Sequence, residues 1–336
     1  MYRLTALSWT VRDRPSRIGI LLLPLLTFAL VACVPHPQQL TQPIVGGSRI
    51  AFDSNRDGNA EVYVMDADGA HQEPRSHTPG ERKYSWLPAW SPDRKNISFA
   101  SNRDGSSDQI YVMGVDGSNV HQLTHTPGKS NWNSDWSPDG KTIAFDSDRD
   151  GKWEIYLMSG DGSDVRQLTH TSGDGWENGN PDWSPDGKQI VFASGQPPDF
   201  SENEIYVMDA NGSAIRRLTH TPGKGNWTPR WTPDQTRIVF SSNRNSTLNV
   251  PPDVDIDVYM MDADGSDVRQ LTIHERASRP HWSPDGKRIV FMSARDCRAA
   301  TIKECQFQQE LYVMDADGSK MKRLTHNEKH DGHPAW

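Results

Sequence analysis

Long hydrophobic runs are scarce in this chain of 336 residues. The apolar stretch from Ile18 to Ala32 covers 15 residues and is interrupted by Pro24, which is short for a membrane-spanning helix. Clusters of basic residues are also missing: the net charge is −8, and it becomes −11 once residues 1–32 are set aside. Phosphate contacts need clustered lysine and arginine, so the acidic balance argues against nucleic acid as a partner.

Cysteine is equally scarce, with three residues in the whole chain. Cys33 ends the stretch "LVAC", which follows several arginines and the apolar run and resembles a bacterial lipobox. We therefore predict a lipoprotein signal peptide over residues 1–32, and membrane attachment through a lipid on Cys33 alone. The alternative is an ordinary signal peptide beside a chance cysteine. Val34, which is not aspartate, favours the outer membrane facing the periplasm over another extracytoplasmic membrane face.

The other two cysteines, Cys297 and Cys305, lie eight residues apart. Outside the cytoplasm such a pair forms a disulfide more often than a metal site. We therefore predict a disulfide between them.

The remainder of the chain is repetitive and rich in turn residues, with 26 glycines, 23 prolines and 12 tryptophans. One copy reads "DWSPDGKTIAFDSDRDGKWEIYLMSGDGSDVRQLTH". Four short strand signals in it are separated by glycine-containing turns, which predicts a four-stranded antiparallel meander. The strand of the "IYLM" type is apolar at every position, which suits a strand covered on both faces.

A tryptophan ends the first predicted strand of each repeat, and these tryptophans recur at spacings of 46 to 54 residues: Trp90, Trp136, Trp183, Trp231, Trp282 and Trp336. Four strands in a period of this length are the signature of a β-propeller. The first copy, "SRIAFDSNRDGNAEVYVM", has no tryptophan strand before it, and the last tryptophan strand, "GHPAW", has nothing after it. We therefore predict an all-β, six-bladed β-propeller closed by pairing of the C-terminal strand with the N-terminal blade.

The pattern "WSPDGKxIxF…SxRDG…IYVMDADGSxxxxLT" resembles the TolB-like (WD40-like) propeller repeat over residues 48–336. Relatives of this repeat occur in TolB, in prolyl-oligopeptidase relatives and in oligogalacturonate lyases. Residues 33–47 read as a flexible tether, which leaves no room for the α/β domain that precedes the propeller of TolB. The chain also lacks the G-x-S-x-G motif of the oligopeptidase hydrolase domain.

The loops between second and third strands lengthen in the last three repeats, whereas the "SPDG" and "DADGS" turns barely vary. We expect the irregular loops and the blade-crossing loops to share one face, and binding to occur there. Extra tryptophans precede the repeat tryptophans in the crossing loops. The predicted binding face comprises Trp86, Trp132, Trp176, Trp227, His281 and His333. The alternative role for these rings is to cap the gaps between blades.

The histidines of the "LTH" segments, such as His125 and His170, recur once per blade and should lie too far apart to share a metal. His281, His330 and His333 stand nearer the inner strands and are better ligand candidates. "DADG" lacks the remaining acids of a calcium loop and is predicted to be a hairpin turn. We assign no cofactor and no metal ligand from the sequence, with calcium or another divalent metal left as the alternative.

The sequence thus favours a cell-envelope lipoprotein that acts as a scaffold for an envelope protein or peptide, with a glycan as another ligand class. The competing hypothesis is a carbohydrate-active propeller enzyme, lyase-like, with a metal in the channel. A calcium-stabilised structural module is the third. We find no paired carboxylates and no nucleophile–base pair outside the repeat pattern, so no catalytic residue is assigned and the balance is against an enzyme.

Overall fold

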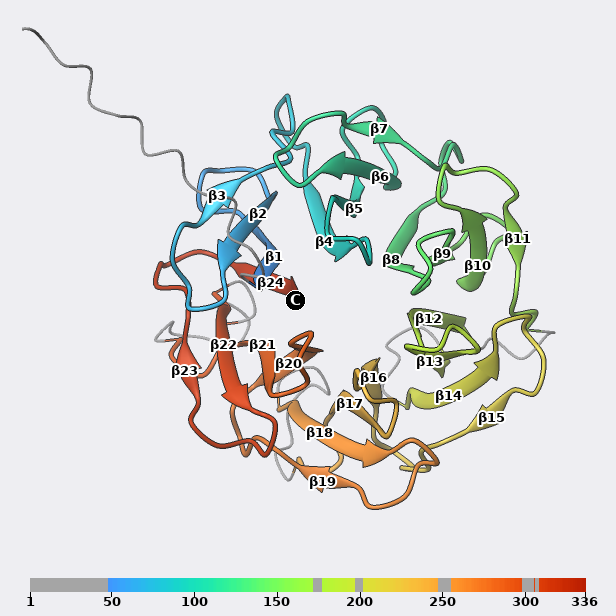
Figure 1. Ribbon diagram of the computed structural model, residues 1–336, viewed down its shortest axis with the longest axis vertical. Coiled ribbons are helices and arrows are strands. Elements are labelled where there is room, and N and C mark those ends of the chain that lie inside the picture. The colour runs from blue at the N-terminus through green and yellow to red at the C-terminus, as the bar shows by residue number, and fades with distance from the viewer. Residues whose placement is uncertain (1–47, 172–176, 197–201, 247–254, 298–304, 306–307) are drawn as a thin grey trace, which may run out of the picture. The chain divides into compact units, whose positions relative to one another are not determined.

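The repeats form six four-stranded antiparallel sheets that surround a central axis as blades (Figure 1). The computed structural model describes residues 48–171, 177–196, 202–246, 255–297, 305 and 308–336. The all-β, six-bladed propeller predicted from the repeats is confirmed.

The blades are named here in ring order, and their strands are given from the axis outward. Blade 1 contains β24 (Asp331–Ala335), β1 (Arg49–Ser54), β2 (Glu61–Asp66) and β3 (Glu73–Pro74); blade 2 contains β4 (Ser85–Trp90), β5 (Asn96–Ser101), β6 (Gln109–Gly114) and β7 (His121–Gln122). Blade 3 contains β8 (Asn131–Trp136), β9 (Thr142–Ser147), β10 (Glu154–Ser159) and β11 (Arg166–Gln167); blade 4 contains β12 (Glu177–Trp183), β13 (Gln189–Gly195), β14 (Glu204–Asp209) and β15 (Arg216–Arg217). Blade 5 contains β16 (Asn226–Trp231), β17 (Arg237–Ser242), β18 (Asp257–Asp262) and β19 (Arg269–Gln270); blade 6 contains β20 (Ala277–Trp282), β21 (Arg288–Ser293), β22 (Glu310–Asp315) and β23 (Lys322–Arg323).

Blade 1 closes the ring, because its inner strand β24 comes from the end of the chain and its other strands from the start of the repeats (Figure 1). The antiparallel register pairs Ala335 with Ala51 and Asp331 with Ser54. The indole of Trp336 is 3% exposed and donates a hydrogen bond to Ser48. This pairing confirms the predicted closure and leaves no unpaired sheet edge at the junction.

The hydrophobic core lies between neighbouring blades. Tyr63 of β2 packs toward blade 6, against residues such as Leu311, whereas Val62 and Val64 of the same strand pack toward blade 2, against Phe99. The third strand of a blade is therefore buried on both faces, as its continuous apolar sequence predicted.

The two faces of the ring differ as expected. On one, the turn face, the turn between third and fourth strands is bonded to the turn between first and second strands, as where Val115 N–H donates to Lys95 O over 2.9 Å. On the other, the crossing-loop face, loops between second and third strands contact the loops that join blades, as where Asn102 N–H donates to Tyr84 O over 3.3 Å. The "DADG" segments are Asx turns, in which Asp68 Oδ1 accepts from Ala70 N–H at 2.9 Å.

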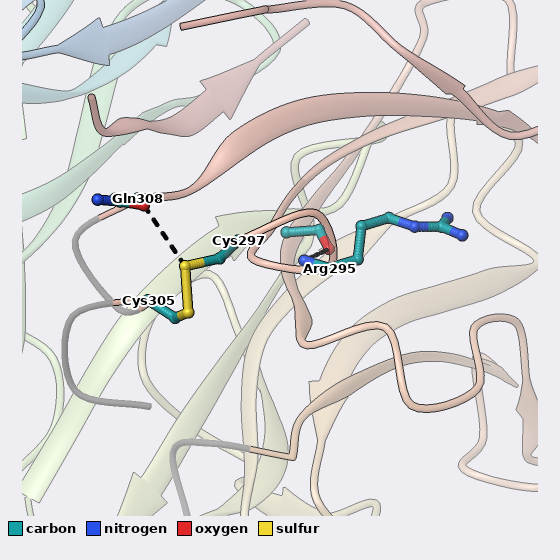
Figure 2. The surroundings of a disulfide bond; sticks show 5 residues. Arg295, Cys297, Cys305 and Gln308 are labelled. Atoms are coloured by element: carbon teal, nitrogen blue, oxygen red, sulfur yellow. Dashed lines mark hydrogen bonds between the residues drawn. A yellow bond between two sulfur atoms is a disulfide. The ribbon is translucent and has the colours of Figure 1, made fainter. Parts of the chain in front are cut away.

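Cys297 and Cys305 are joined by a disulfide in blade 6, with their Cα atoms 5.5 Å apart (Figure 2). Gln308 Oε1 lies 3.5 Å from the Cys297 sulfur, so the end of the loop sits against the bond. The predicted signal peptide, the lipidation site Cys33, the tether and Trp176 lie outside the described residues. No helix in the described part of the chain is long and apolar enough to cross a bilayer.

Candidate functional site

Each inner strand carries a β-bulge three residues before the repeat tryptophan. At this position the backbone is left-handed although the residue is never glycine, with φ between 45° and 54°: Leu87, Asn133, Asn180, Thr228, Arg279 and His333. A bulge redirects the side chain that it carries, and left-handed non-glycine residues persist only where their surroundings hold them. The six bulges therefore set the directions of the side chains that the inner strands present near the axis.

Side chains of neighbouring blades hold several of these bulges in place. Asn180 N–H donates to Asp146 Oδ2 over 2.9 Å, and Arg279 N–H donates to Ser241 Oγ over 3.0 Å. Leu87 N–H donates to Asp53 Oδ1 over a longer 3.3 Å. In each case the acceptor lies on the second strand of the preceding blade, so the shape of the mouth depends on contacts between blades.

Below the bulges, the channel is narrow and lined by ionisable side chains. The free space that remains is about 30 Å³, enough for a single water molecule. Asp135 Oδ2 accepts the N–H of Trp183 at 2.8 Å, and Asp182 Oδ2 accepts the N–H of Trp231 at 2.7 Å. Arg230 Nε lies 3.7 Å from Asp182 Oδ1. These carboxylates link blade 3 to blade 4 and blade 4 to blade 5.

Burial dominates the protonation of this channel group. It raises the pKa of both Asp135 and Asp182, and the charge of Asp135 raises that of Asp182 further, to about 8. His281 Nδ1 accepts the N–H of Trp336 at 3.2 Å. Burial, and then the charge of Arg230, lower the pKa of His281 to about 3, so the ring is neutral. We interpret this layer as a structural lock between blades.

Arg279 crosses the mouth of the channel. It starts on blade 6, and its guanidinium lies 3.4 Å from Asn133 Oδ1 on blade 3, on the opposite side of the ring. Burial, the largest effect, lowers the pKa of Arg279 to about 10, while the charges of Asp53 and Asp146 act in the opposite direction. Arg279 is therefore a cation at the centre of the crossing-loop face, between two buried carboxyl groups.

Aromatic rings run along one side of this mouth. Trp132 stacks on Trp153 with ring centroids 4.2 Å apart, Trp86 meets Trp132 edge-on at 5.6 Å, and Tyr84 meets Trp86 at 5.9 Å. His333 packs on the other side of Trp86, also at 5.6 Å. The indole N–H of Trp132 donates to Asp108 Oδ2 over 2.7 Å, which fixes the orientation of that ring.

A pocket of about 300 Å³ opens beside these rings, where blade 4 departs from the repeat. The position occupied by Trp132 in blade 3 and by Trp227 in blade 5 is Gly179 in blade 4. The pocket lies over this glycine, with Trp132, Trp153 and Trp227 among its walls and Arg279 among its lining residues. The missing indole creates the space that the neighbouring indoles enclose.

Two residues that line this pocket, Asp146 and Asn180, each have a buried Oδ1 acceptor with no hydrogen-bond partner among the described residues. Asp146 is 2% exposed, and burial raises its pKa to about 6. A buried polar atom without a partner is costly, so it points to a ligand or a water molecule that supplies a donor. The pocket can thus accept an N–H or O–H group between aromatic walls.

The structure brings most of the predicted binding residues to this face. Trp86, Trp132 and Trp227 are each partly exposed, and His333 lies at the channel mouth. His281 instead lines the channel, two residues beyond the bulge at Arg279, where its ring accepts the N–H of Trp336. We expected the extra tryptophans to be more exposed than all the repeat tryptophans, and this difference does not hold for every repeat tryptophan. Trp90 and Trp136 are also only partly buried, and the Trp136 indole donates to Ser98 Oγ over 3.0 Å.

Sequence reasoning missed Trp153, Asp146, Asn180, Arg279 and the role of Gly179. One signal was present: an alignment of the repeats shows a glycine in blade 4 where tryptophan stands on both sides. The contribution of Asp146 comes from another blade, and no local pattern in the sequence indicates it.

The TolB beta propeller domain family matches residues 73–201 and 172–307, so the chain belongs to this family. Its structure is similar to that of TolB from Acinetobacter baumannii, with a TM-score of 0.66 and 24% identity, covering 86% of this chain and 66% of that one. A TolB candidate of Agrobacterium tumefaciens has a TM-score of 0.59 and 25% identity, with coverage of 83% and 88%. Among curated proteins, YuxL, an uncharacterized peptidase of Bacillus subtilis, is 28% identical over 108 residues, which are 32% of this chain and only 15% of YuxL. The matched part of this chain thus spans less than two thirds of the length of YuxL and of the Acinetobacter protein.

Proposed function

We propose that this protein is a lipid-anchored protein of the bacterial cell envelope whose propeller binds a protein or peptide partner at the pocket over Gly179. The lipobox-like segment ending at Cys33 supports the anchor and the location. The disulfide between Cys297 and Cys305 supports an oxidising compartment.

The observation that carries the binding role is the pairing of aromatic walls with unpartnered acceptors. Asp146 Oδ1 and Asn180 Oδ1 need donors, and Trp132 with Trp153 offers stacked aromatic rings beside them. A segment that inserts a lysine or arginine side chain, or peptide N–H groups, satisfies the acceptors and gains cation–π contact with the indoles. Partly exposed tryptophans at the centre of a surface are also typical interface hot spots.

The binding site is tested with matched variants on the two faces. Partners crosslinked in native envelopes are identified, and the affinity of the purified partner or its peptide is then measured. We expect the double variant Trp132→Ala/Trp227→Ala to bind at least about tenfold more weakly than wild type, equivalent to about 1.4 kcal/mol. Asp116→Asn, in an exposed Asx turn of the turn face, serves as the control and should bind normally. Loss of binding in Asp116→Asn but not in the tryptophan variant would show that the partner binds the turn face, contrary to the proposal.

The same assay separates the ligand classes. If wild type bound oligosaccharides to saturation and bound no peptide, the ligand would be a glycan and not the proposed protein or peptide.

The anchor is tested separately through Cys33→Ser. Wild type should partition into detergent with the membrane fraction, whereas the variant should accumulate as a longer precursor or in soluble form. Identical partitioning of the two proteins would contradict the lipid anchor and leave the binding result unaffected.

A further inference from the structure

The ring closure brings together an aspartate from one end of the propeller and two histidines from the other. Asp53 lies on β1, His333 lies on β24, and His330 immediately precedes β24. His333 Nδ1 is 2.6 Å from Asp53 Oδ1, and His330 Nε2 is 3.7 Å from Asp53 Oδ2. One ligand atom from each of the three side chains lies within 4.8 Å of the other two.

The repeat does not require this group. The position of Asp53 in the second strand is occupied in the other blades by Ala100, Asp146, Ala193, Ser241 and Met292. Histidine occurs at neither equivalent inner-strand position in those blades; blade 3, for example, combines its aspartate with Asn133 and Ser130. This combination of an aspartate and two histidines at these repeat positions occurs in blade 1 and in no other blade, so it is a departure from the symmetry of the repeats.

The surroundings of the group suit a bound ion. Asp53 is 2% exposed, and the side chains of His330 and His333 are 20% and 11% exposed, so all three are largely shielded from water. His330 Nδ1 is buried without a hydrogen-bond partner among the described residues, and its Nε2 is beyond hydrogen-bond distance from Asp53. The ring of His330 is therefore held beside a carboxylate by packing, with no hydrogen bond within this part of the chain to account for its orientation.

We propose that Asp53, His330 and His333 bind a divalent transition-metal ion, with Zn²⁺ as the reference ion. Two imidazoles and one carboxylate are a ligand set for such ions, whereas Ca²⁺ and Mg²⁺ prefer oxygen ligands throughout. Bonds of about 2.0–2.2 Å require ligand atoms roughly 3–4 Å apart. The contact between His333 and Asp53 therefore opens slightly on binding, and that between His330 and Asp53 hardly changes. Three protein ligands leave a coordination position for water or another donor.

The site has a structural consequence that does not depend on any partner. Asp53 and His333 are 280 positions apart in sequence, so the ligands converge only when β24 is paired with β1. The ion thus binds the closed ring and not the open chain, and the free energy by which it stabilises closure grows with the logarithm of its concentration relative to its dissociation constant. Arg279 places a positive charge on the same side of the mouth and opposes the ion, which limits the affinity.

A second cluster, Asp255, Asp257 and His274 in blade 5, offers a comparison within the same chain. Both oxygens of Asp257 already accept hydrogen bonds, from the Thr272 hydroxyl and from the backbone N–H groups of His274 and Glu275 among others. Metal binding there would break several bonds of the blade, so this cluster serves as the control site.

The experiment uses the full chain without a histidine tag, stripped with a chelator and dialysed. Zn²⁺ binding is measured by competition with a chromophoric chelator, and melting temperature is measured with and without Zn²⁺. Wild type should bind one equivalent and melt at a higher temperature with Zn²⁺. His330→Ala and His333→Ala should each bind at least tenfold more weakly and lose the shift in melting temperature. The controls His326→Ala, an exposed "LTH" histidine, and His274→Ala should behave as wild type.

The design remains decisive if one variant folds poorly. The His330 side chain makes no hydrogen bond through Nδ1 to any residue that the structure describes, so His330→Ala should fold, and Co²⁺ bound to wild type should give visible absorption bands that this variant lacks. Absence of Zn²⁺ binding by wild type, equal binding by His330→Ala, or loss of binding in His274→Ala instead would each overturn the proposal.

Discussion

A Cβ atom placed on Gly179 would lie 2.8 Å from Oδ2 of Asp146, a residue of the neighbouring blade. That oxygen also accepts the N–H of Asn180 at 2.9 Å and a hydrogen bond from the Asn133 amide at 2.8 Å. The carboxylate therefore occupies the space that a side chain at position 179 would need. Blade 4 therefore has a glycine beside this carboxylate where blades 3 and 5 carry Trp132 and Trp227, and the pocket lies over that glycine.

We predict that Gly179→Ala lowers the free energy of unfolding by about 1–3 kcal/mol. The new methyl group displaces Asp146 and strips a buried N–H of its acceptor, which carries a penalty of that size. Gly105→Ala is the control, because a Cβ there meets nothing within 4 Å. Denaturant unfolding of the three proteins measures the difference. Equal stability of Gly179→Ala and wild type would mean that Asp146 is free to move, contrary to the geometry.

The ring closure leads to a second prediction. Trp336 is 3% exposed, its indole donates to Ser48, and the guanidinium of Arg288 lies 4.6 Å from its ring centroid. Trp336→Ala should lower the free energy of unfolding by about 3–5 kcal/mol, as large-to-small changes in a core do. Trp153→Ala, at a partly exposed indole, should cost clearly less. Deletion of residues 331–336 removes the whole strand and should lower the melting temperature further. A truncated protein that melts like wild type would contradict closure by β24.

The blade number, the strand order and the closure were predictable from the sequence because they follow from counting one repeated pattern. Each "IYVM" strand is apolar throughout, and the phase of the tryptophan strands shows which blade is split. The disulfide was predictable for a different reason, since Cys297 and Cys305 lie only eight positions apart in the sequence.

The site itself was predictable only in part. Trp86, Trp132 and Trp227 could be placed on one face from their spacing alone. The left-handed bulges could not be predicted from the sequence, because residues as different as Leu87 and Arg279 adopt nearly the same φ. Contacts between blades impose this conformation. Likewise, the meeting of Asp53 with His333 depends on the exact register between β1 and β24, which the repeat pattern does not determine.

The disulfide provides a third prediction. It closes a loop between two cysteines eight positions apart, and constraining a loop of this size in the unfolded chain stabilises a protein by about 2–3 kcal/mol. The double variant Cys297→Ser/Cys305→Ser should unfold more easily than oxidised wild type by this amount. Reduced wild type should match the variant, which itself should not respond to reductant. Mass spectrometry confirms the redox state of each sample, and unchanged stability of wild type after verified reduction would refute the prediction.

The channel carboxylates make the stability of the protein depend on pH. Burial and the charge of Asp135 raise the pKa of Asp182 from 3.8 to about 8 in the folded protein. A carboxyl group whose pKa is higher in the folded state binds its proton more tightly there than in the unfolded chain. Its contribution to stability is therefore fully present below about pH 4 and is lost as the pH rises toward about 8, at about 1.4 kcal/mol for each unit of difference in pKa.

We accordingly predict that Asp182→Asn flattens the pH dependence of the unfolding free energy between pH 4 and pH 8. The amide oxygen of asparagine can still accept the N–H of Trp231, which Asp182 binds at 2.7 Å, so the hydrogen bond between blades 4 and 5 is kept while the titrating group is removed. Wild type should lose stability across this range, and the variant should lose markedly less and be the more stable of the two near pH 8. Asp68→Asn makes the same substitution at an exposed turn and should keep the wild-type slope. Denaturant titrations at five pH values give the slopes, and a variant slope as steep as that of wild type would show that Asp182 does not carry the buried proton.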